Sequence, residues 1–204
     1  LQDTIVLRKR QQLTIYAATT EPITISGSLH SLFLLNGHSR LILENIHLHH
    51  TLESDDHRKV GAAVNLRYKA SLSISNSRIK SRSGFCCWAV QKATIELVRC
   101  DLLAPIRSPV VCFGQATCRL THCTISNAGV HAVCARGACH IYLDHCTISK
   151  SVARAVYAYA NASVTLTHCS ISGTIRPDKA AIEVSAAGGG VDGSSSSLTM
   201  RDCN

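Results

Sequence analysis

The fold is decided by the stretch Ala70-Ser71-Leu72-Ser73-Ile74-Ser75-Asn76-Ser77-Arg78-Ile79. Its pattern returns about 23 residues later as Ala93-Thr94-Ile95-Glu96-Leu97-Val98-Arg99-Cys100-Asp101-Leu102. The same spacing then leads to the stretches 116–125, 139–148 and 162–171, and all five units align without a gap. A repeat of this length predicts a solenoid, in which similar units stack and bury one continuous core.

Aliphatic residues and cysteines occupy fixed columns in these units. Each unit has three pairs of columns, and the two members of a pair are two residues apart. The pairs are represented by Val64 with Leu66, Leu72 with Ile74, and Ser77 with Ile79. Side chains two residues apart on a strand point to the same face, so each pair predicts a short strand with one buried face. Later members of the columns include Ile95, Cys118, Ile141 and Val164; Cys100, Cys123, Cys146 and Cys169; and Cys87, Val110, Val133 and Val156.

Three short strands in about 23 residues leave no room for the helix that a βαβ unit requires. If each unit is one turn of a coil, equivalent residues stack at the parallel strand spacing of about 4.8 Å. The sequence therefore predicts an all-β fold, a right-handed parallel β-helix. It would be a single-stranded solenoid with about 23 residues and three short strands per turn.

The whole chain, residues 1–204, is expected to form one β-helix domain, and we expect this domain to be part of a longer chain. Residues 1–30 contain short apolar runs that predict the first strands of the coil, and residues 31–204 supply the repeat turns. The spacing lengthens at two places, which predicts loops at residues 51–60 and 177–197.

The eleven cysteines lie mostly inside the apolar strand patterns, where a free thiol behaves as a small buried hydrophobic group. This placement favours an intracellular, reducing compartment over a disulfide-bonded secreted scaffold. In the adjacent pair Cys86 and Cys87, strand alternation predicts that Cys86 is the more exposed thiol. No run of about 18 apolar residues is present, so no transmembrane span is expected.

The recurring form Ser71-Leu72-Ser73-Ile74-Ser75-Asn76-Ser77-Arg78-Ile79 resembles the repeats of the pectate-lyase-like superfamily, over roughly residues 31–204. The resemblance implies the fold but not one activity, since this superfamily includes polysaccharide lyases, hydrolases, epimerases, phage tailspikes and non-enzymatic interaction modules. The form His-Cys-Thr-Ile-Ser, at 122–126 and 145–149, is most similar to intracellular members such as F-box substrate adaptors and SHC-binding proteins.

One polar column lies directly before the cysteines and contains Asn76, Arg99, His122, His145 and His168. Stacked imidazoles could bind a transition metal, but ligands in a straight line do not by themselves converge on an ion. A sharp corner after the strand would instead favour residues that tolerate left-handed backbone geometry, as asparagine does. We therefore predict a corner ladder at this column, and no metal site or cofactor.

The predicted loop at 51–60 is the one dense cluster of carboxylates, imidazoles and basic groups, with Asp55, Asp56, His57 and Arg58 as candidate catalytic residues. Near it in the repeat lies a set of basic residues, which we interpret as a candidate binding patch: Arg67, Lys69, Arg78, Lys80, Arg82 and Lys92. The net charge of +8 suits an acidic protein or an anionic glycan. Nucleic acid is disfavoured, because no aromatic residues appear interleaved with the basic ones.

Two functions follow from these patterns. The first is a non-enzymatic interaction or assembly module that binds a protein partner through its faces and inserted loops. Few outward acidic residues and an interior rich in cysteine favour it over catalysis. The alternative is a carbohydrate-active enzyme, a lyase or an epimerase, acting on an acidic polysaccharide.

Overall fold

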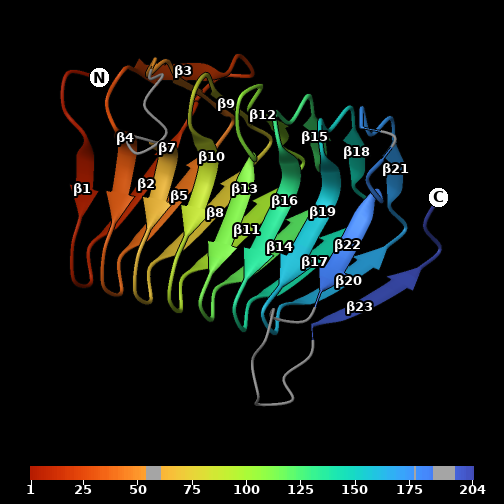
Figure 1. The fold of residues 1–204 in the computed structure, drawn as a ribbon. Coiled ribbons are helices and arrows are strands. Elements are labelled where there is room, and N and C mark those ends of the chain that lie inside the picture. The colour runs from red at the N-terminus through yellow and green to blue at the C-terminus, as the bar shows by residue number, and fades with distance from the viewer. Residues whose placement is uncertain (54–60, 177, 186–195) are drawn as a thin grey trace.

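The computed structural model describes residues 1–53, 61–176, 178–185 and 196–204. In these residues the chain forms β-strands and no α-helix, and the strands make three parallel sheets that wind along one axis (Figure 1). Sheet A comprises β1 (Ile5–Leu7), β4 (Ser31–Leu35), β7 (Ala62–Leu66), β10 (Phe85–Ala89), β13 (Val110–Phe113), β16 (His131–Arg136), β19 (Arg154–Tyr159) and β22 (Ile182–Ser185). Sheet B comprises β2 (Gln12–Tyr16), β5 (Arg40–Glu44), β8 (Ser71–Ser75), β11 (Thr94–Val98), β14 (Thr117–Thr121), β17 (His140–Asp144), β20 (Ser163–Thr167) and β23 (Ser197–Arg201). Sheet C comprises β3 (Ile23–Gly27), β6 (Ile46–His50), β9 (Arg78–Ser81), β12 (Asp101–Leu103), β15 (Thr124–Ser126), β18 (Thr147–Ser149) and β21 (Ser170–Ser172).

The strand register matches the columns read from the sequence. Ile95 pairs with Leu72 on one side and with Cys118 on the other, so the residues of one column lie directly above one another. Leu102 likewise pairs with Ile79 and Ile125. The prediction of a right-handed parallel β-helix with three short strands in each repeat is therefore confirmed.

The predicted loop at 51–60 lies mostly outside the described residues. The predicted loop at 177–197 contains a strand, β22, which pairs with β19 and continues sheet A. Leu41 pairs with Leu72 across the first insertion, and Val164 pairs with Leu198 across the second. The strands on either side of each insertion therefore keep the register of the coil. At the start of the chain, β1 to β3 form the first turn and pair with β4, β5 and β6.

The corners of the coil are built from single residues with left-handed backbone geometry. The corner between sheets B and C has a positive φ at Asn76, Arg99, His122, His145 and His168, and also at Asn45 and Asp202. From Asn45 to His168, each corner amide donates to a carbonyl of the next turn, as His145 N does to Thr167 O at 2.9 Å. The predicted corner ladder is confirmed, and the polar side chains there follow from backbone geometry that favours such residues.

The cysteines lie largely in the core, and none is in a disulfide. In the column after the B–C corner, each thiol from Cys100 to Cys169 lies within hydrogen-bonding distance of two backbone carbonyls, and its single S–H can donate to either. Cys146 Sγ, for example, lies 3.4 Å from both Leu120 O and Asp144 O. Corner carbonyls such as Asp144 O and Thr167 O already accept from backbone amides, so these thiols add a second, weak donor while they fill space in the core.

One cysteine prediction is wrong, because Cys86 is fully buried beside Cys87. The amides of both residues donate to Pro109 O at 3.0 Å, which is the two-against-one pattern of a β-bulge. The bulge interrupts strand alternation, so both side chains turn inward, and Cys86 Sγ lies 3.3 Å from Ile79 O and from Leu103 O. Burial raises the pKa of the Cys86 thiol to about 12.

Candidate interaction surface on sheet A

The outward face of sheet A carries five of the chain's nine aromatic residues: Phe85, Trp88, Phe113, Tyr157 and Tyr159. Outward positions of a β-helix are normally solvated. Here two of them, Asn65 and Val111, are only 2% and 3% exposed, because larger neighbours on the same face cover them. We call the outward residues of β10, β13, β16 and β19, together with Glu183, the sheet A face.

One half of this face is centred on Trp88. Its ring meets the ring of Phe85 edge to face, with centroids 5.5 Å apart, and that of Phe113 at 6.4 Å. The stacked register of β10 and β13 brings these rings together from two turns of the coil. Such edge-to-face pairs add a modest stabilisation to the burial of the rings.

The other half of the face combines aromatic rings with arginines. Tyr157 packs between His131 and Tyr159, with ring centroids 4.7 and 4.9 Å away. The guanidinium groups of Arg154 and Arg136 lie over Tyr157 and Tyr159, at 4.9 and 5.6 Å from the ring centroids. Planar groups from successive turns therefore form one continuous patch.

A partly buried ion pair fixes the end of this patch. Arg154 Nε donates to Glu183 Oε2 at 2.7 Å, and the Arg154 side chain is only 14% exposed. Burial, together with the nearby positive charge of Arg154, lowers the pKa of His131 to about 4, although Glu183 opposes the shift. His131 is therefore neutral at pH 7.

Two ring nitrogens on the sheet A face have no hydrogen-bond partner among the described residues. They are Trp88 Nε1 and His131 Nδ1, and both atoms are buried. An unsatisfied buried polar group costs about 1 to 3 kcal/mol, so the close packing of these rings is achieved at some cost to the stability of the fold.

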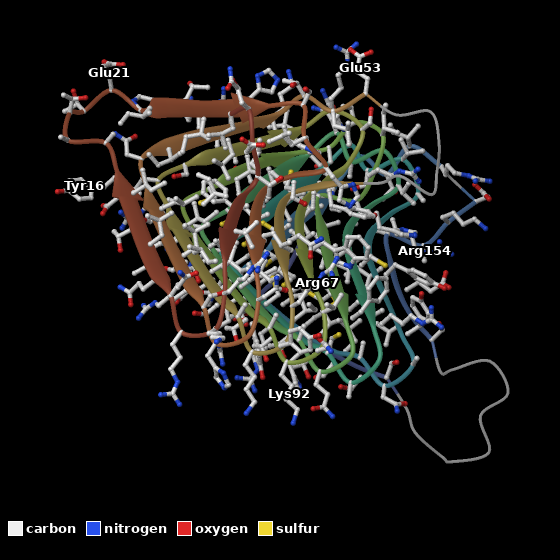
Figure 2. The ribbon with its side chains drawn as sticks, turned by 90° about the vertical axis from the view of Figure 1, so that its left-hand side faces the viewer. Tyr16, Glu21, Glu53, Arg67, Lys92 and Arg154 are labelled. Carbon is white, nitrogen blue, oxygen red and sulfur yellow. The ribbon has the colours of Figure 1, made fainter. Side chains whose placement is uncertain are left out.

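The structure divides the predicted basic patch into two groups. Arg67, Lys69 and Lys92 lie at the corner between sheets A and B, where Lys69 and Lys92 line a hollow of about 470 Å³ with Gly37, His38, Tyr68 and Gln91. Seen along the axis, Arg67 and Arg154 lie on one side of the coil and Lys92 at its lower corner (Figure 2).

The remaining basic residues lie on or beside sheet C. Arg78 and Lys80 project from β9, where both line hollows on the outer face of that sheet. Arg78 pairs with Asp101 at 3.2 Å, and Arg82 pairs with Glu53 at 2.6 Å. These pairs are exposed, so each contributes little to stability. The candidate catalytic residues Asp55, Asp56, His57 and Arg58 lie outside the described residues.

The sheet A face was not predicted from the sequence, because its aromatic residues do not recur in every turn. The available signal was an outward column that follows the buried column of Cys87 and Val156 by one position. That outward column contains Trp88, Val111, Cys134 and Tyr157, so it combines two aromatic residues with two smaller ones.

The fold defines the class of the protein: it is a right-handed parallel β-helix. A family described as the right handed beta helix region matches residues 108–204, which covers the turns from β13 onward. No curated protein and no solved structure matches the chain significantly. Within the described residues, no helix is long and apolar enough to cross a membrane.

Proposed function

We propose that this β-helix is a non-enzymatic interaction module that binds a protein partner through the sheet A face. The observation that carries the proposal is the gathering of Trp88, Tyr157, Tyr159, Arg136 and Arg154 on one side of the coil. Tryptophan, tyrosine and arginine dominate the residues at which protein interfaces concentrate their binding energy.

Comparison with the outer face of sheet C supports the choice of sheet A. Beyond Arg78 and Lys80, the outer face of sheet C carries mainly short hydroxyl side chains, at positions such as Thr124, Ser126 and Thr147. Such side chains contribute little at the centres of interfaces and are typical of a solvated surface. The sheet A face differs from sheet C by its planar, partly desolvated groups.

The packing of the sheet A face also favours binding energetically. Tyr157 is held by stacking on both sides, and Arg154 is held by its ion pair with Glu183. Side chains that are already ordered lose little conformational entropy when a partner docks. A flat sheet face with ordered anchors therefore suits a folded protein partner.

The test replaces the two central anchors. We expect Trp88→Ala and Tyr157→Ala each to weaken binding of a protein retained from a native extract, by about 30-fold or more, because anchors of this kind contribute roughly 2 kcal/mol. The measurement is the Kd of that protein, once purified, for each variant.

Tyr142→Ala provides the matched control for these variants. Tyr142 is a half-buried tyrosine on the outer face of sheet B, with Arg119 at 4.3 Å from its ring. It therefore resembles Tyr157 in its surroundings but lies on another face, and its replacement should leave the Kd unchanged. Equal losses of affinity in all three variants would contradict the proposal.

A second candidate is a carbohydrate-active enzyme, a lyase or an epimerase acting on an acidic polysaccharide. The observation that favours it is the meeting of His131, Tyr157, Arg154 and Glu183, since a neutral imidazole and a phenol can exchange protons beside a basic group. Incubation with polyuronates tests it, because a lyase releases unsaturated products. Turnover that is lost in Asp55→Asn and Asp56→Asn would place the activity in the 51–60 loop instead.

An intracellular, reducing location belongs to the same proposal, as does the relation to F-box adaptors and SHC-binding proteins. The reducing location is supported by the cysteines. All eleven are free, and Cys134 and Cys203 are the two that are not fully buried. Denatured protein isolated without reductant should then contain eleven titratable thiols. A lower number would indicate disulfides and would contradict this location.

A further inference from the structure

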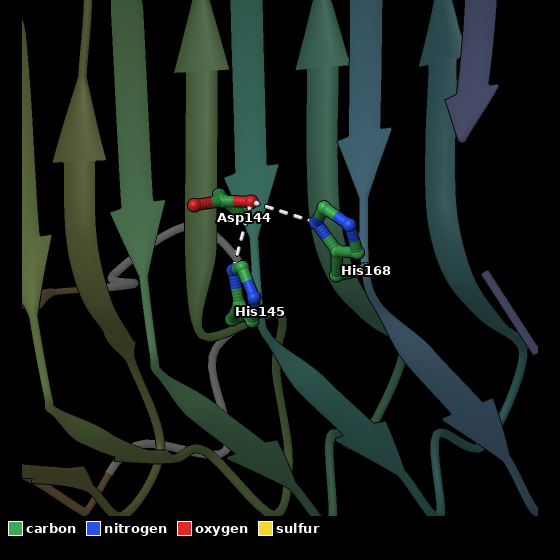
Figure 3. A group of neighbouring side chains, drawn as sticks. All are labelled: Asp144, His145 and His168. Carbon is green, nitrogen blue, oxygen red and sulfur yellow. Dashed lines mark ion pairs between the residues drawn. The ribbon is translucent and has the colours of Figure 1, made fainter. Parts of the chain in front are cut away.

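Three side chains capable of metal ligation meet at the corner between sheets B and C. They are Asp144, at the end of β17, and the corner residues His145 and His168 of two successive turns (Figure 3). His145 Nδ1 lies 3.0 Å from Asp144 Oδ1, and His168 Nδ1 lies 3.6 Å from the same oxygen. Both imidazoles therefore turn the same ring nitrogen toward one carboxylate.

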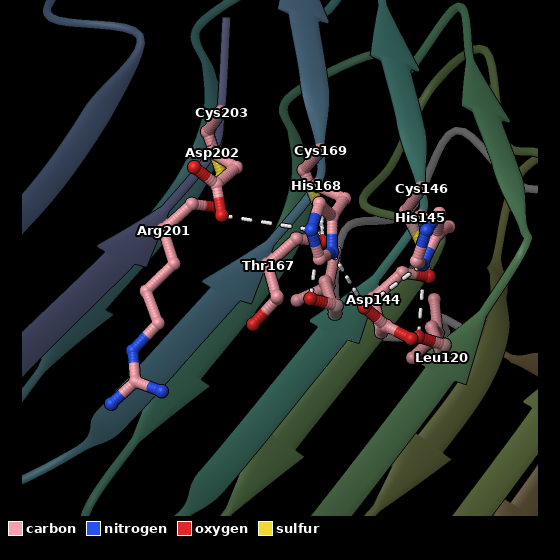
Figure 4. A network of polar contacts seen from close by, with 11 residues as sticks. Leu120, Asp144, His145, Cys146, Thr167, His168, Cys169, Arg201, Asp202 and Cys203 are labelled. Carbon is pink, nitrogen blue, oxygen red and sulfur yellow. Dashed lines mark hydrogen bonds and ion pairs between the residues drawn. The ribbon is translucent and has the colours of Figure 1, made fainter.

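The backbone fixes this arrangement. His145 N donates to Thr167 O, and His168 N donates to Arg201 O, both at 2.9 Å, so the two corner residues are held in successive rungs of one ladder (Figure 4). Their rings stack with centroids 4.5 Å apart. The thiols of Cys146 and Cys169 bond to the adjoining carbonyls and hold the chain directly behind each imidazole.

The carboxylate lies off the line of the histidine column, and this removes the objection to ligands arranged in a straight row. Asp144 occupies the strand position before the corner, where the neighbouring turns carry Val98, Thr121, Thr167 and Arg201. Of these turns, only the one with Asp144 offers an acidic side chain next to two imidazoles. The combination is therefore a local feature and does not follow from the repeat itself.

We infer that Asp144, His145 and His168 bind a divalent transition metal ion, of the class of Zn²⁺, Co²⁺ or Ni²⁺. Each of the three residues offers a ligand atom within 4.8 Å of the other two. We assign Asp144 Oδ1 and the two Nδ1 atoms as these ligands, since both nitrogens lie close to that oxygen. Tetrahedral bonds of about 2.0–2.2 Å separate the ligand atoms by roughly 3.3–3.6 Å, so these distances need only small adjustments. The side chains are 46–48% exposed, so their rings can turn by the small amount needed.

A second carboxylate supports this inference independently. The other ring nitrogen of His168, Nε2, lies 3.6 Å from Asp202 Oδ2, on the far side of the ring from Asp144. A histidine that binds a metal through one nitrogen commonly donates its other N–H to a carboxylate, which orients the ring and makes it a better ligand. Three protein ligands would leave a coordination position for water or for a group of a bound molecule.

The test uses Co²⁺ alone with the full chain under reducing conditions, because the absorption of bound Co²⁺ separates nitrogen and oxygen ligands from thiolate. We expect one bound ion, a d–d spectrum of low coordination number and no thiolate charge-transfer band. His145→Asn and His168→Asn should each lower the affinity by at least about 10-fold, and the double variant should abolish binding. Asp202→Asn should weaken binding by about 10-fold.

Asparagine is the appropriate replacement, because the same corner column already contains it at Asn45 and Asn76 with positive φ. His122→Asn is the matched control. His122 stacks on His145 with centroids 4.8 Å apart but is not one of the three clustered ligands, so this variant should bind Co²⁺ normally. Unchanged affinity in the His145→Asn, His168→Asn double variant, or a thiolate band, would overturn the inference. The corner is separate from the sheet A face, so either result leaves the proposed function to be judged on its own test.

Discussion

Replacing Gly84 with alanine should lower the free energy of unfolding by about 3 kcal/mol or more, because the new methyl group would collide with backbone atoms of the neighbouring turn. A Cβ atom at this position would lie 2.2 Å from Gly61 O and 2.8 Å from Gly61 C, in the turn below. That carbonyl accepts the hydrogen bond from Phe85 N at 2.9 Å, so it cannot move away without breaking the ladder between turns. Urea unfolding, followed by circular dichroism, measures the change.

Gly173→Asn serves as the control for Gly84→Ala. Gly173 has a φ of +63°, but its column holds Asn127 and Lys150 with the same geometry, and the nearest atom to an added Cβ is 3.6 Å away. This variant should remain within about 1 kcal/mol of the original protein. Equal free energies of unfolding for the two variants would contradict the close approach of the two turns at Gly84.

Acidification from pH 7 to pH 4 should destabilise the protein, because two histidines are held neutral in the folded state. His50 is buried and bonded through both ring nitrogens, to Ser81 Oγ at 2.8 Å and Leu29 O at 2.7 Å. Burial lowers the pKa of His50, and His30 reinforces this shift while the bond to Leu29 opposes it. The pKa of His131, which faces Arg154 and Glu183, is lowered to about 4.

The direction of this pH dependence follows from proton binding by the folded and unfolded states. In the unfolded chain both histidines take up a proton near pH 6.5, whereas the folded state does so only at lower pH, so stability falls as the pH drops through this interval. His131 should contribute about 1 to 2 kcal/mol of the loss, less than the full linkage value because its ring is partly exposed. Below about pH 4 its contribution should level off, since His131 is then protonated in the folded state as well.

Unfolding curves at several pH values between 7 and 4 test this expectation. His131→Gln should flatten the dependence, while His140→Gln, which changes an exposed histidine on sheet B, should leave it unaltered. A stability that rises on acidification, or equal pH profiles for all three proteins, would be incompatible with a His131 that is neutral in the folded state.

Most of the fold could be predicted from the sequence because stacking makes the same demand in every turn. Leu72, Ile95 and Ile141 meet identical surroundings, so similar residues recur at a fixed spacing and reveal the register. The left-handed corner residues were predictable for the same reason. Cys86 was not, because a β-bulge changes which way a side chain points without leaving a periodic signal.

The candidate sites could not be predicted because they depend on departures from the repeat. Trp88, Phe113 and Tyr157 lie in one patch although they belong to different turns and to two different outward columns. Asp144 stands out from its column by being acidic, and its meeting with two histidines depends on side-chain orientation at a corner. Sequence columns specify which residues stack, but not which outward side chains turn toward one another.

The central claim, that the sheet A face binds a protein partner, is tested most directly by oxidative footprinting of side chains with and without the partner. We predict that the partner protects Trp88, Phe113, Tyr157 and Tyr159 from oxidation. Tyr16 and Tyr68, which are 63% and 56% exposed, lie away from this face and should remain reactive. Protection of Tyr16 or Tyr68, with Trp88 and Tyr157 unchanged, would contradict the account.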